Sequence, residues 1–118
     1  MEADRDVTYR AMHLIAEYLL KSGHPVILDA TYTRPVHTMA LRDLAGASGV
    51  ALRIIQCRVS ADLAVRRFKE RSPGHFAVDL TEQRVRDFAN AYPYRDDVLT
   101  VSIDGAIEPW MDRIVSYV

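Results

Sequence analysis

The feature that most limits the fold of this chain is an alternation of helix-forming segments with short apolar runs. Val26-Ile27-Leu28 is an unbroken apolar run closed by Asp29, which predicts a strand buried on both faces, as parallel strands are. Further strands are predicted over 50–59 and 98–103. The helices expected around them cover residues 7–21, 35–48, the segment after Ser60, the segment after Thr81 and the segment after Pro109. This order predicts a three-layer α/β fold with a short parallel sheet of about three strands flanked by helices.

Residues at the segment ends support these boundaries. Gly23 is placed to end the first helix, and Pro35 suits a first helical position. Ser60 is a predicted N-cap, and Asp79-Leu80-Thr81-Glu82 resembles a capping box. The chain nevertheless opens with a helix that has no strand before it, and its sheet is small for so many helices.

Composition narrows the class of protein. The 118 residues suffice for one domain and not for two. A net charge of −1 gives no indication of nucleic-acid binding or of an anionic membrane as partner. Because Cys57 is the single cysteine, no intramolecular disulfide can form, and a reducing cytoplasm is predicted. No apolar run approaches the roughly 18 residues that a membrane span requires.

Several motifs, taken in order, carry a resemblance to a known group. The segment 26–31, then a helix and a strand, then Arg67-Phe68-Lys69-Glu70-Arg71, resembles the small P-loop kinases related to polynucleotide kinase, zeta toxins and gluconate kinase. The nearest likeness is to the ATP-binding half of bacterial proteins that join an aminoglycoside-phosphotransferase-like domain to such a kinase. Residues 79–82 and 91–94 also look like that group, and the resemblance runs from about residue 5 to residue 118. It implies an AAA-type P-loop NTPase with ATP and Mg²⁺ as cofactors and a nucleotide or small molecule as phosphate acceptor.

One departure from that group bears directly on function. The resembling enzymes begin with a strand and a Gly-x-x-x-x-Gly-Lys-Ser/Thr loop, whose backbone N–H groups and lysine hold the phosphates. This chain has five glycines, and none is followed by lysine. We therefore expect 1–118 to be a single truncated P-loop kinase-like domain that is inactive alone. Two alternatives stay open for its cofactors: ATP and Mg²⁺, as the resemblance implies, or none in this chain. ATP affinity no better than millimolar is expected.

The same departure affects the predicted sheet. The resemblance implies the strand order 2-3-1-4-5, with the loop-bearing strand in the centre. The predicted strands at 26–29 and 50–57 would then flank an empty position and expose unpaired backbone groups. Three outcomes are open: the two strands close up, a strand from a partner or a second copy fills the position, or the isolated chain is unstable.

Asp29 and Thr31 are the first candidate site residues. Ligands of open α/β sheets collect at strand ends, and Asp29 ends a predicted strand. The resemblance implies that this carboxylate is catalytic and contacts Mg²⁺, and that Thr31 contributes to cofactor binding. The alternative is that Asp29 only caps the strand end by accepting hydrogen bonds from nearby N–H groups.

Three arginines are the other candidates. Arg67 and Arg71 are four residues apart, so both lie on one face of a helix near its C-terminal end. The resemblance makes them catalytic residues of a lid over about 67–80, with Arg71 also binding the nucleotide phosphates. Arginines also favour the last turn of a helix because of its dipole, which is the competing explanation. Arg84 is a further phosphate-binding candidate or part of a solvated face, and His75 and Phe76 would face the substrate from the lid.

Two functions from different classes follow from these features. The first is the C-terminal part of an ATP-dependent kinase. The second is a non-catalytic binding or assembly module that derives from such a kinase and completes its sheet with a partner strand. A third and weaker interpretation takes Asp29-Ala30-Thr31 as a phosphatase nucleophile motif, in which Thr31 occupies the place of the second aspartate.

Overall fold

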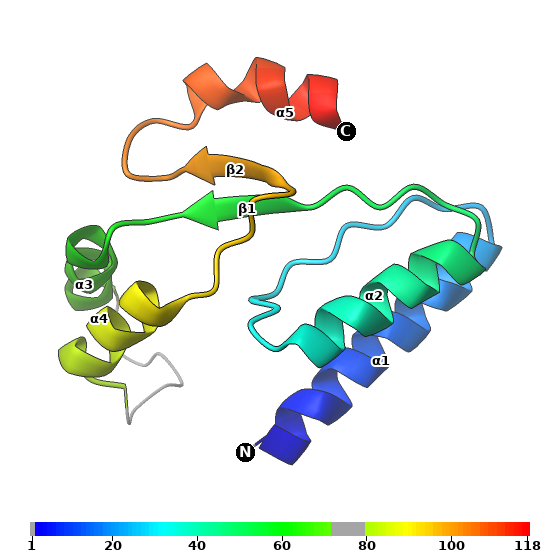
Figure 1. Cartoon of the computed structure of the whole chain (residues 1–118), viewed down its shortest axis with the longest axis horizontal. Helices are drawn as coiled ribbons and strands as arrows, with labels where there is room; N and C mark the ends of the chain where they lie inside the picture. The colour runs from blue at the N-terminus through cyan, green and yellow to red at the C-terminus, as the bar shows by residue number, and fades with distance from the viewer. Residues whose placement is uncertain (1, 72–79) are drawn as a thin grey trace. The chain divides into compact units, whose positions relative to one another are not determined.

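A computed structural model describes residues 2–71 and 80–118 (Figure 1). The chain forms two compact units, residues 1–52 (unit 1) and 53–118 (unit 2), and each is described by itself. Unit 1 contains two helices, and unit 2 contains a two-stranded parallel sheet with further helices. The predicted α/β class with a short parallel sheet is therefore confirmed, although the described residues form two strands where about three were expected.

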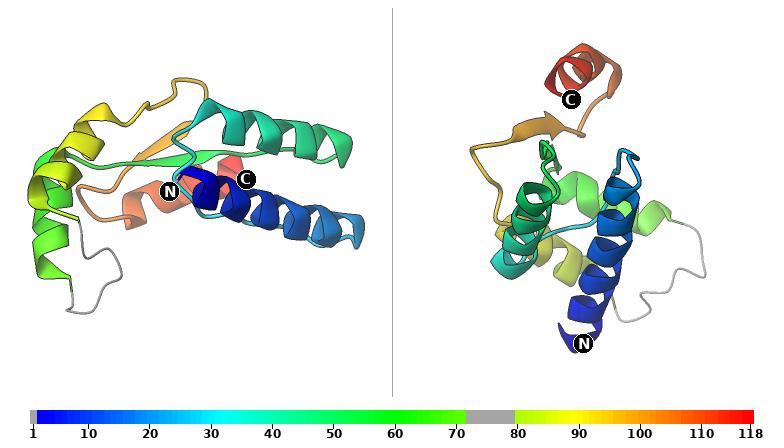
Figure 2. Two further views of the ribbon diagram at one scale, coloured as in Figure 1. Left: turned by 90° about the horizontal axis from the view of Figure 1, so that it is seen from below. Right: turned by 90° about the vertical axis from the view of Figure 1, so that its right-hand side faces the viewer.

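Unit 1 is a pair of helices, α1 (Glu2–Lys21) and α2 (Pro35–Ala47), which lie side by side (Figures 1 and 2). Their N-terminal ends lie together, because Asp6 in α1 is bonded to Arg34 and His37 at the start of α2. Ala16 and Ala45, one on each helix, are buried. Small residues of this kind let two helix backbones approach closely.

Both helices of unit 1 end as their sequences predict. Gly23 and Gly49 have φ of 83° and 68°, in the left-handed region that glycine enters without a steric penalty. The N–H of His24 then donates to the carbonyl of Leu19, and that of Val50 donates to the carbonyl of Ala45. These bonds span five residues and satisfy carbonyls that the last helical turn leaves free, which is the Schellman arrangement.

The predicted strand at 26–29 is not observed, and that prediction was wrong. The segment after α1 is extended but has no hydrogen-bonded ladder in the described part of the chain. Ile27 is 96% exposed, whereas burial on both faces was expected. The reason is physical: an apolar run becomes a strand only when a neighbouring strand pairs with its backbone groups.

Unit 2 is built around the strands β1 (Ile55–Arg58) and β2 (Leu99–Ser102), which pair in parallel with Ile55 opposite Leu99. Both strands lie inside the predicted ranges 50–59 and 98–103 and are shorter than them. Their adjacency is the one that the implied order gives for the last two strands. Val101 is only 1% exposed and is the most deeply buried large side chain among the described residues.

The connection between the two strands contains the helices α3 (Ala61–Glu70) and α4 (Glu82–Ala91), which pack against each other. Asp62 at the start of α3 is paired with Arg86, and Lys69 near its end is paired with Glu82, so the helices are antiparallel. Ser60 and Thr81 are their N-caps, each accepting a backbone N–H three residues on. The predicted cap at Ser60 is confirmed, and Thr81 is the capping residue of the second helix, while Asp79 lies outside the described residues.

The C-terminal part of unit 2 is a 3₁₀ turn, η1 (Glu108–Trp110), followed by α5 (Met111–Tyr117). Pro109 stands in η1, so the closing helix begins where it was expected. Tyr117 joins this helix to the chain before β1, because its hydroxyl accepts from the N–H of Ile54 at 3.2 Å. Nowhere in residues 2–71 and 80–118 is there a helix with the length and apolar character of a membrane span.

Candidate functional site

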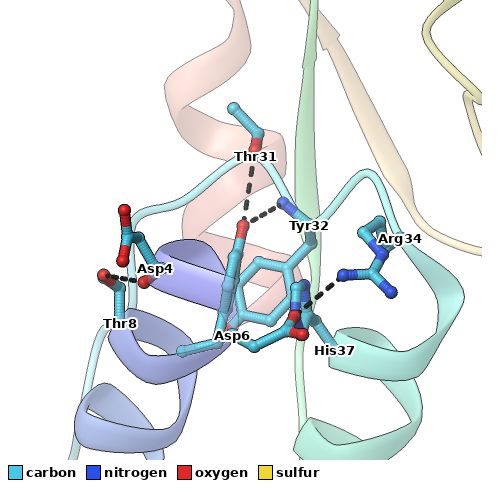
Figure 3. Close-up of polar contacts among 8 residues, drawn as sticks. Asp4, Asp6, Thr8, Thr31, Tyr32, Arg34 and His37 are labelled. Atoms are coloured by element: carbon cyan, nitrogen blue, oxygen red, sulfur yellow. Dashed lines mark hydrogen bonds and ion pairs between the residues drawn. The ribbon is translucent and has the colours of Figure 1, made fainter. Parts of the chain in front are cut away.

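The loop between α1 and α2 contains both Asp29 and Thr31, and both are exposed. A tyrosine from α1 fixes the end of the loop next to α2: the N–H of Tyr32 donates to the hydroxyl of Tyr9 at 2.9 Å (Figure 3, where the ring of Tyr9 is drawn without a label). The hydroxyls of Tyr9 and Thr31 are 3.3 Å apart. Tyr32 has φ of 45°, a left-handed conformation that costs about 1–2 kcal/mol for a residue with a Cβ. Contacts with α1 therefore compensate a strained loop residue.

A charged group fixes the same end of this loop, directly before α2 (Figure 3). One carboxylate oxygen of Asp6 accepts from Nη1 of Arg34 at 2.8 Å, and it lies 2.8 Å from Nε2 of His37. His37 is 7% exposed, and Asp6 and Arg34 are partly exposed. The carboxylate thus orients a buried imidazole and anchors the residue that precedes α2.

Four aromatic rings pack between the helices and the loop. The rings of Tyr9 and His37 are stacked with their centroids 3.8 Å apart, and Tyr9 and Tyr32 meet edge to face at 4.9 Å. Nε2 of His13 lies 2.9 Å from the hydroxyl of Tyr32. We call these four residues, with Asp6, the loop clamp: Asp6, Tyr9, His13, Tyr32 and His37.

Burial changes the acid–base properties of two clamp residues. It raises the pKa of Tyr32 to about 12, with a further contribution from Tyr9. Burial also lowers the pKa of His13 below its ordinary value, and the neighbouring His37 lowers it further. At neutral pH, Tyr32 is therefore a neutral hydroxyl and His13 a neutral imidazole, so the bond between them joins two uncharged groups.

We expect the stability of unit 1 to fall as the pH is lowered, because of His13. The pKa of His13 in the folded chain lies below the unfolded value of 6.5, so the unfolded state binds this proton first. The stabilisation by His13 is complete above pH 6.5 and is lost as the pH falls through the lower, folded pKa. His13→Gln keeps a polar group near Tyr32 but cannot be charged.

Thermal unfolding of both proteins between about pH 7.5 and 5 tests this prediction. The variant is expected to lose less stability over that range than the unchanged chain, and His24→Gln, at an exposed position, serves as a control. Parallel stability curves for the unchanged chain and His13→Gln would contradict it.

The three candidate arginines all lie in unit 2. Nη2 of Arg67 donates to the carbonyl of Ile103, just after β2, at 2.7 Å. The guanidinium of Arg71, at the C-cap of α3, lies 4.4 Å from the ring centroid of Phe68. Arg84 is exposed in the first turn of α4. Arg67 thus has a structural contact of its own, and the phosphate-binding roles of all three remain predictions.

The residues of the site predicted from the sequence therefore fall into two groups, one in each unit. Asp29 and Thr31 belong to unit 1, and Arg67, Arg71 and Arg84 belong to unit 2. The lid residues His75 and Phe76 lie outside the described residues. In the part of the chain that is described, no three His, Cys, Asp or Glu side chains form a metal-binding group. A lone carboxylate such as Asp29 still fits Mg²⁺, which keeps several waters and takes its other ligands from phosphates.

Sequence reasoning missed the loop clamp as a unit. Asp6, Tyr9 and His13 are spaced by three and four residues, so they lie on one face of α1. This spacing could have identified a polar stripe on the first helix. It could not have identified the partners Tyr32 and His37, because these depend on how α2 packs against α1.

Comparison with known proteins identifies the family. Residues 1–94 match a family described as an AAA domain. This match includes the loop with Asp29 and Thr31, and it includes Arg67 and Arg71. The chain belongs to this family, which is a P-loop NTPase-like, kinase-like group. No curated protein and no solved structure matches the chain.

Proposed function

We propose that this chain is the C-terminal part of an ATP-dependent phosphotransferase of the P-loop kinase type. The observation that carries the proposal is the family match over residues 1–94, which includes Asp29 and Thr31 in an ordered loop. Within the family, the motifs favour the ATP-binding half of fusions with an aminoglycoside-phosphotransferase-like domain. A cytoplasmic setting and a nucleotide or small-molecule phosphate acceptor are part of the same proposal.

Each candidate residue has a role in this proposal. Mg²⁺ with ATP would supply charge neutralisation at the transferred phosphoryl group. Asp29 is exposed on the loop between α1 and α2. It would bind the hydrated Mg²⁺ ion or accept the proton of the acceptor hydroxyl, and Thr31 would form a hydrogen bond with the nucleotide. Arg71 and Arg84 would bind phosphate oxygens, and Arg67 would add positive charge near the end of β2, where its own bond to Ile103 places it.

The phosphate-binding loop of the family is not among these 118 residues, since none of the five glycines precedes a lysine. Backbone N–H groups and a lysine in that loop supply much of the affinity for a triphosphate. We therefore propose that these residues alone bind Mg·ATP weakly and transfer no phosphate. A phosphate-binding loop from outside the 118 residues would be needed for activity.

Weak but localised binding of Mg·ATP is the expected result when the chain is titrated and followed by ¹⁵N-NMR. A dissociation constant above about 1 mM corresponds to binding weaker than about 4 kcal/mol. Amide signals of Asp29 and Thr31 and of Arg67 and Arg71 should move, and Asp29→Asn should reduce the shifts at the loop. Sodium sulfate at the same ionic strength is the control for a non-specific effect of anions.

Two outcomes would contradict this proposal. Micromolar Mg·ATP affinity in calorimetry would show that the missing loop is not needed. Chemical-shift changes confined to other parts of the chain, or equal changes with sulfate, would show that Asp29, Arg67 and Arg71 do not bind the nucleotide.

The second candidate function is a non-catalytic binding or assembly module. The observation in its favour is the extended segment 26–29, which has no ladder partner among the described residues and leaves Ile27 96% exposed. A strand from a second copy or from a partner could pair with such a segment. Concentration-dependent association in light scattering would support this alternative, and a monomeric chain at all concentrations would count against it.

A further inference from the structure

The loop that contains Asp29 and Thr31 has little regular structure of its own. Between the end of α1 and the start of α2 the described backbone forms neither helix nor strand. Tyr32, near the end of this loop, is in a left-handed conformation that an L-residue adopts only when its surroundings compensate. The position of the loop must therefore be set by contacts from outside it.

Tyr9 supplies two of the contacts from α1 that reach the loop. Its hydroxyl accepts the backbone N–H of Tyr32 at 2.9 Å and lies 3.3 Å from the hydroxyl of Thr31. A single oxygen atom on α1 thus contacts two successive residues, Thr31 and Tyr32, which lie two and three positions after Asp29. A bond to the backbone of the strained residue restricts the loop more than a side-chain bond would, because it fixes the peptide plane.

The position of this oxygen is itself fixed by α2. The ring of Tyr9 is stacked on the ring of His37 at 3.8 Å, and His37 is almost fully buried. The carboxylate of Asp6, one turn before Tyr9, lies 2.8 Å from Nε2 of His37. The packing of the two helices therefore determines where the hydroxyl of Tyr9 lies.

We propose that Tyr9 is a positioning residue that sets the conformation of the Asp29–Thr31 loop for its Mg·nucleotide ligand. This inference rests on the proposed function for the identity of the ligand. Tyr9 itself does not touch the ligand; it acts through the backbone of Tyr32 and the hydroxyl of Thr31. Loss of the Tyr9 hydroxyl would not change Asp29 itself, but the loop that contains Asp29 could then adopt other conformations.

Amide hydrogen exchange in Tyr9→Phe, without nucleotide, tests the positioning itself. The variant keeps the ring that stacks on His37 and loses only the hydroxyl, so unit 1 should remain folded. We expect the amide of Tyr32 to exchange at least tenfold faster, a change that corresponds to about 1.4 kcal/mol. Tyr18→Phe, on the same helix with a side chain that is 73% exposed, is the matched control and should leave this amide unchanged.

A titration of both variants with Mg·ATP gives a second readout. In Tyr9→Phe the shifts at Asp29 and Thr31 should be lost or reduced several-fold, whereas those at Arg67 and Arg71 should persist. A loss of stability of unit 1 would instead speed the exchange of amides throughout α1 and α2, and not only at Tyr32. Equal Tyr32 exchange in the two variants, or loop shifts that survive in Tyr9→Phe, would overturn the positioning role. Absence of any Mg·ATP shift in the unchanged chain would instead count against the proposed function, and the exchange result would stand separately.

Discussion

Val101→Asp is expected to prevent unit 2 from folding. Val101 lies in the centre of β2 and is 1% exposed, so the introduced carboxylate would be buried without a partner. A substitution that buries an unpaired charge typically lowers the free energy of unfolding by more than about 4 kcal/mol. Val101→Ala, which removes only two methyl groups, should destabilise by about 2 kcal/mol.

Urea denaturation followed by circular dichroism, with ¹⁵N-NMR of the amides in β1 and β2, measures this effect. The matched control is Cys57→Ser, since Cys57 is the register partner of Val101 on β1 but has an exposed side chain. The control should change the midpoint little. A Val101→Asp protein with native amide shifts in both strands would show that Val101 is not in the core of unit 2.

Gln56→Leu is expected to destabilise unit 2 by about 2–3 kcal/mol, because it leaves the part-buried backbone groups of Arg95 without the partners that Gln56 supplies. Nε2 of Gln56 donates to the carbonyl of Arg95 and to the hydroxyl of Thr100, and its Oε1 accepts the N–H of Arg95. One buried amide thus joins β1, β2 and the chain between α4 and β2. Leucine has nearly the same size but can form none of these bonds.

Thr100→Val separates the contributions in this network. It removes one acceptor of the Gln56 amide and keeps its shape, so a loss of about 1 kcal/mol is expected. Denaturant midpoints of Gln56→Leu, Thr100→Val and the double variant form a cycle, and the two changes should not be additive. Strict additivity, or a stable Gln56→Leu protein, would mean that the amide is not structurally important.

Much of the local structure was predictable because it depends on neighbouring residues. Gly23, Pro35 and Ser60 each marked a helix end from a few residues of sequence, and the structure confirms all three. The prediction of a strand at 26–29 was wrong because a strand forms only when a second strand pairs with it, and the composition of a segment does not show whether such a partner is present. An apolar run shows only that a segment is suited to pairing.

The candidate site was predictable in part. The sequence indicated Asp29 and Thr31, and the structure places both on one exposed loop next to Tyr9. It did not indicate the contact between Arg67 and the carbonyl of Ile103, because these residues are 36 positions apart and meet only in the folded unit. The roles in phosphate transfer depend on a ligand, so they remain predictions.

The topology of unit 2 also bears on the order in which it folds. Gln56 and Thr100 are bonded to each other although 44 positions separate them in the chain. Bringing such distant residues together carries a large entropy of loop closure, which must be met before the pairing becomes favourable. The antiparallel contacts of α3 and α4 lie inside that loop and shorten it once they form. We therefore expect the helix pair to form early and the parallel strands to pair after it.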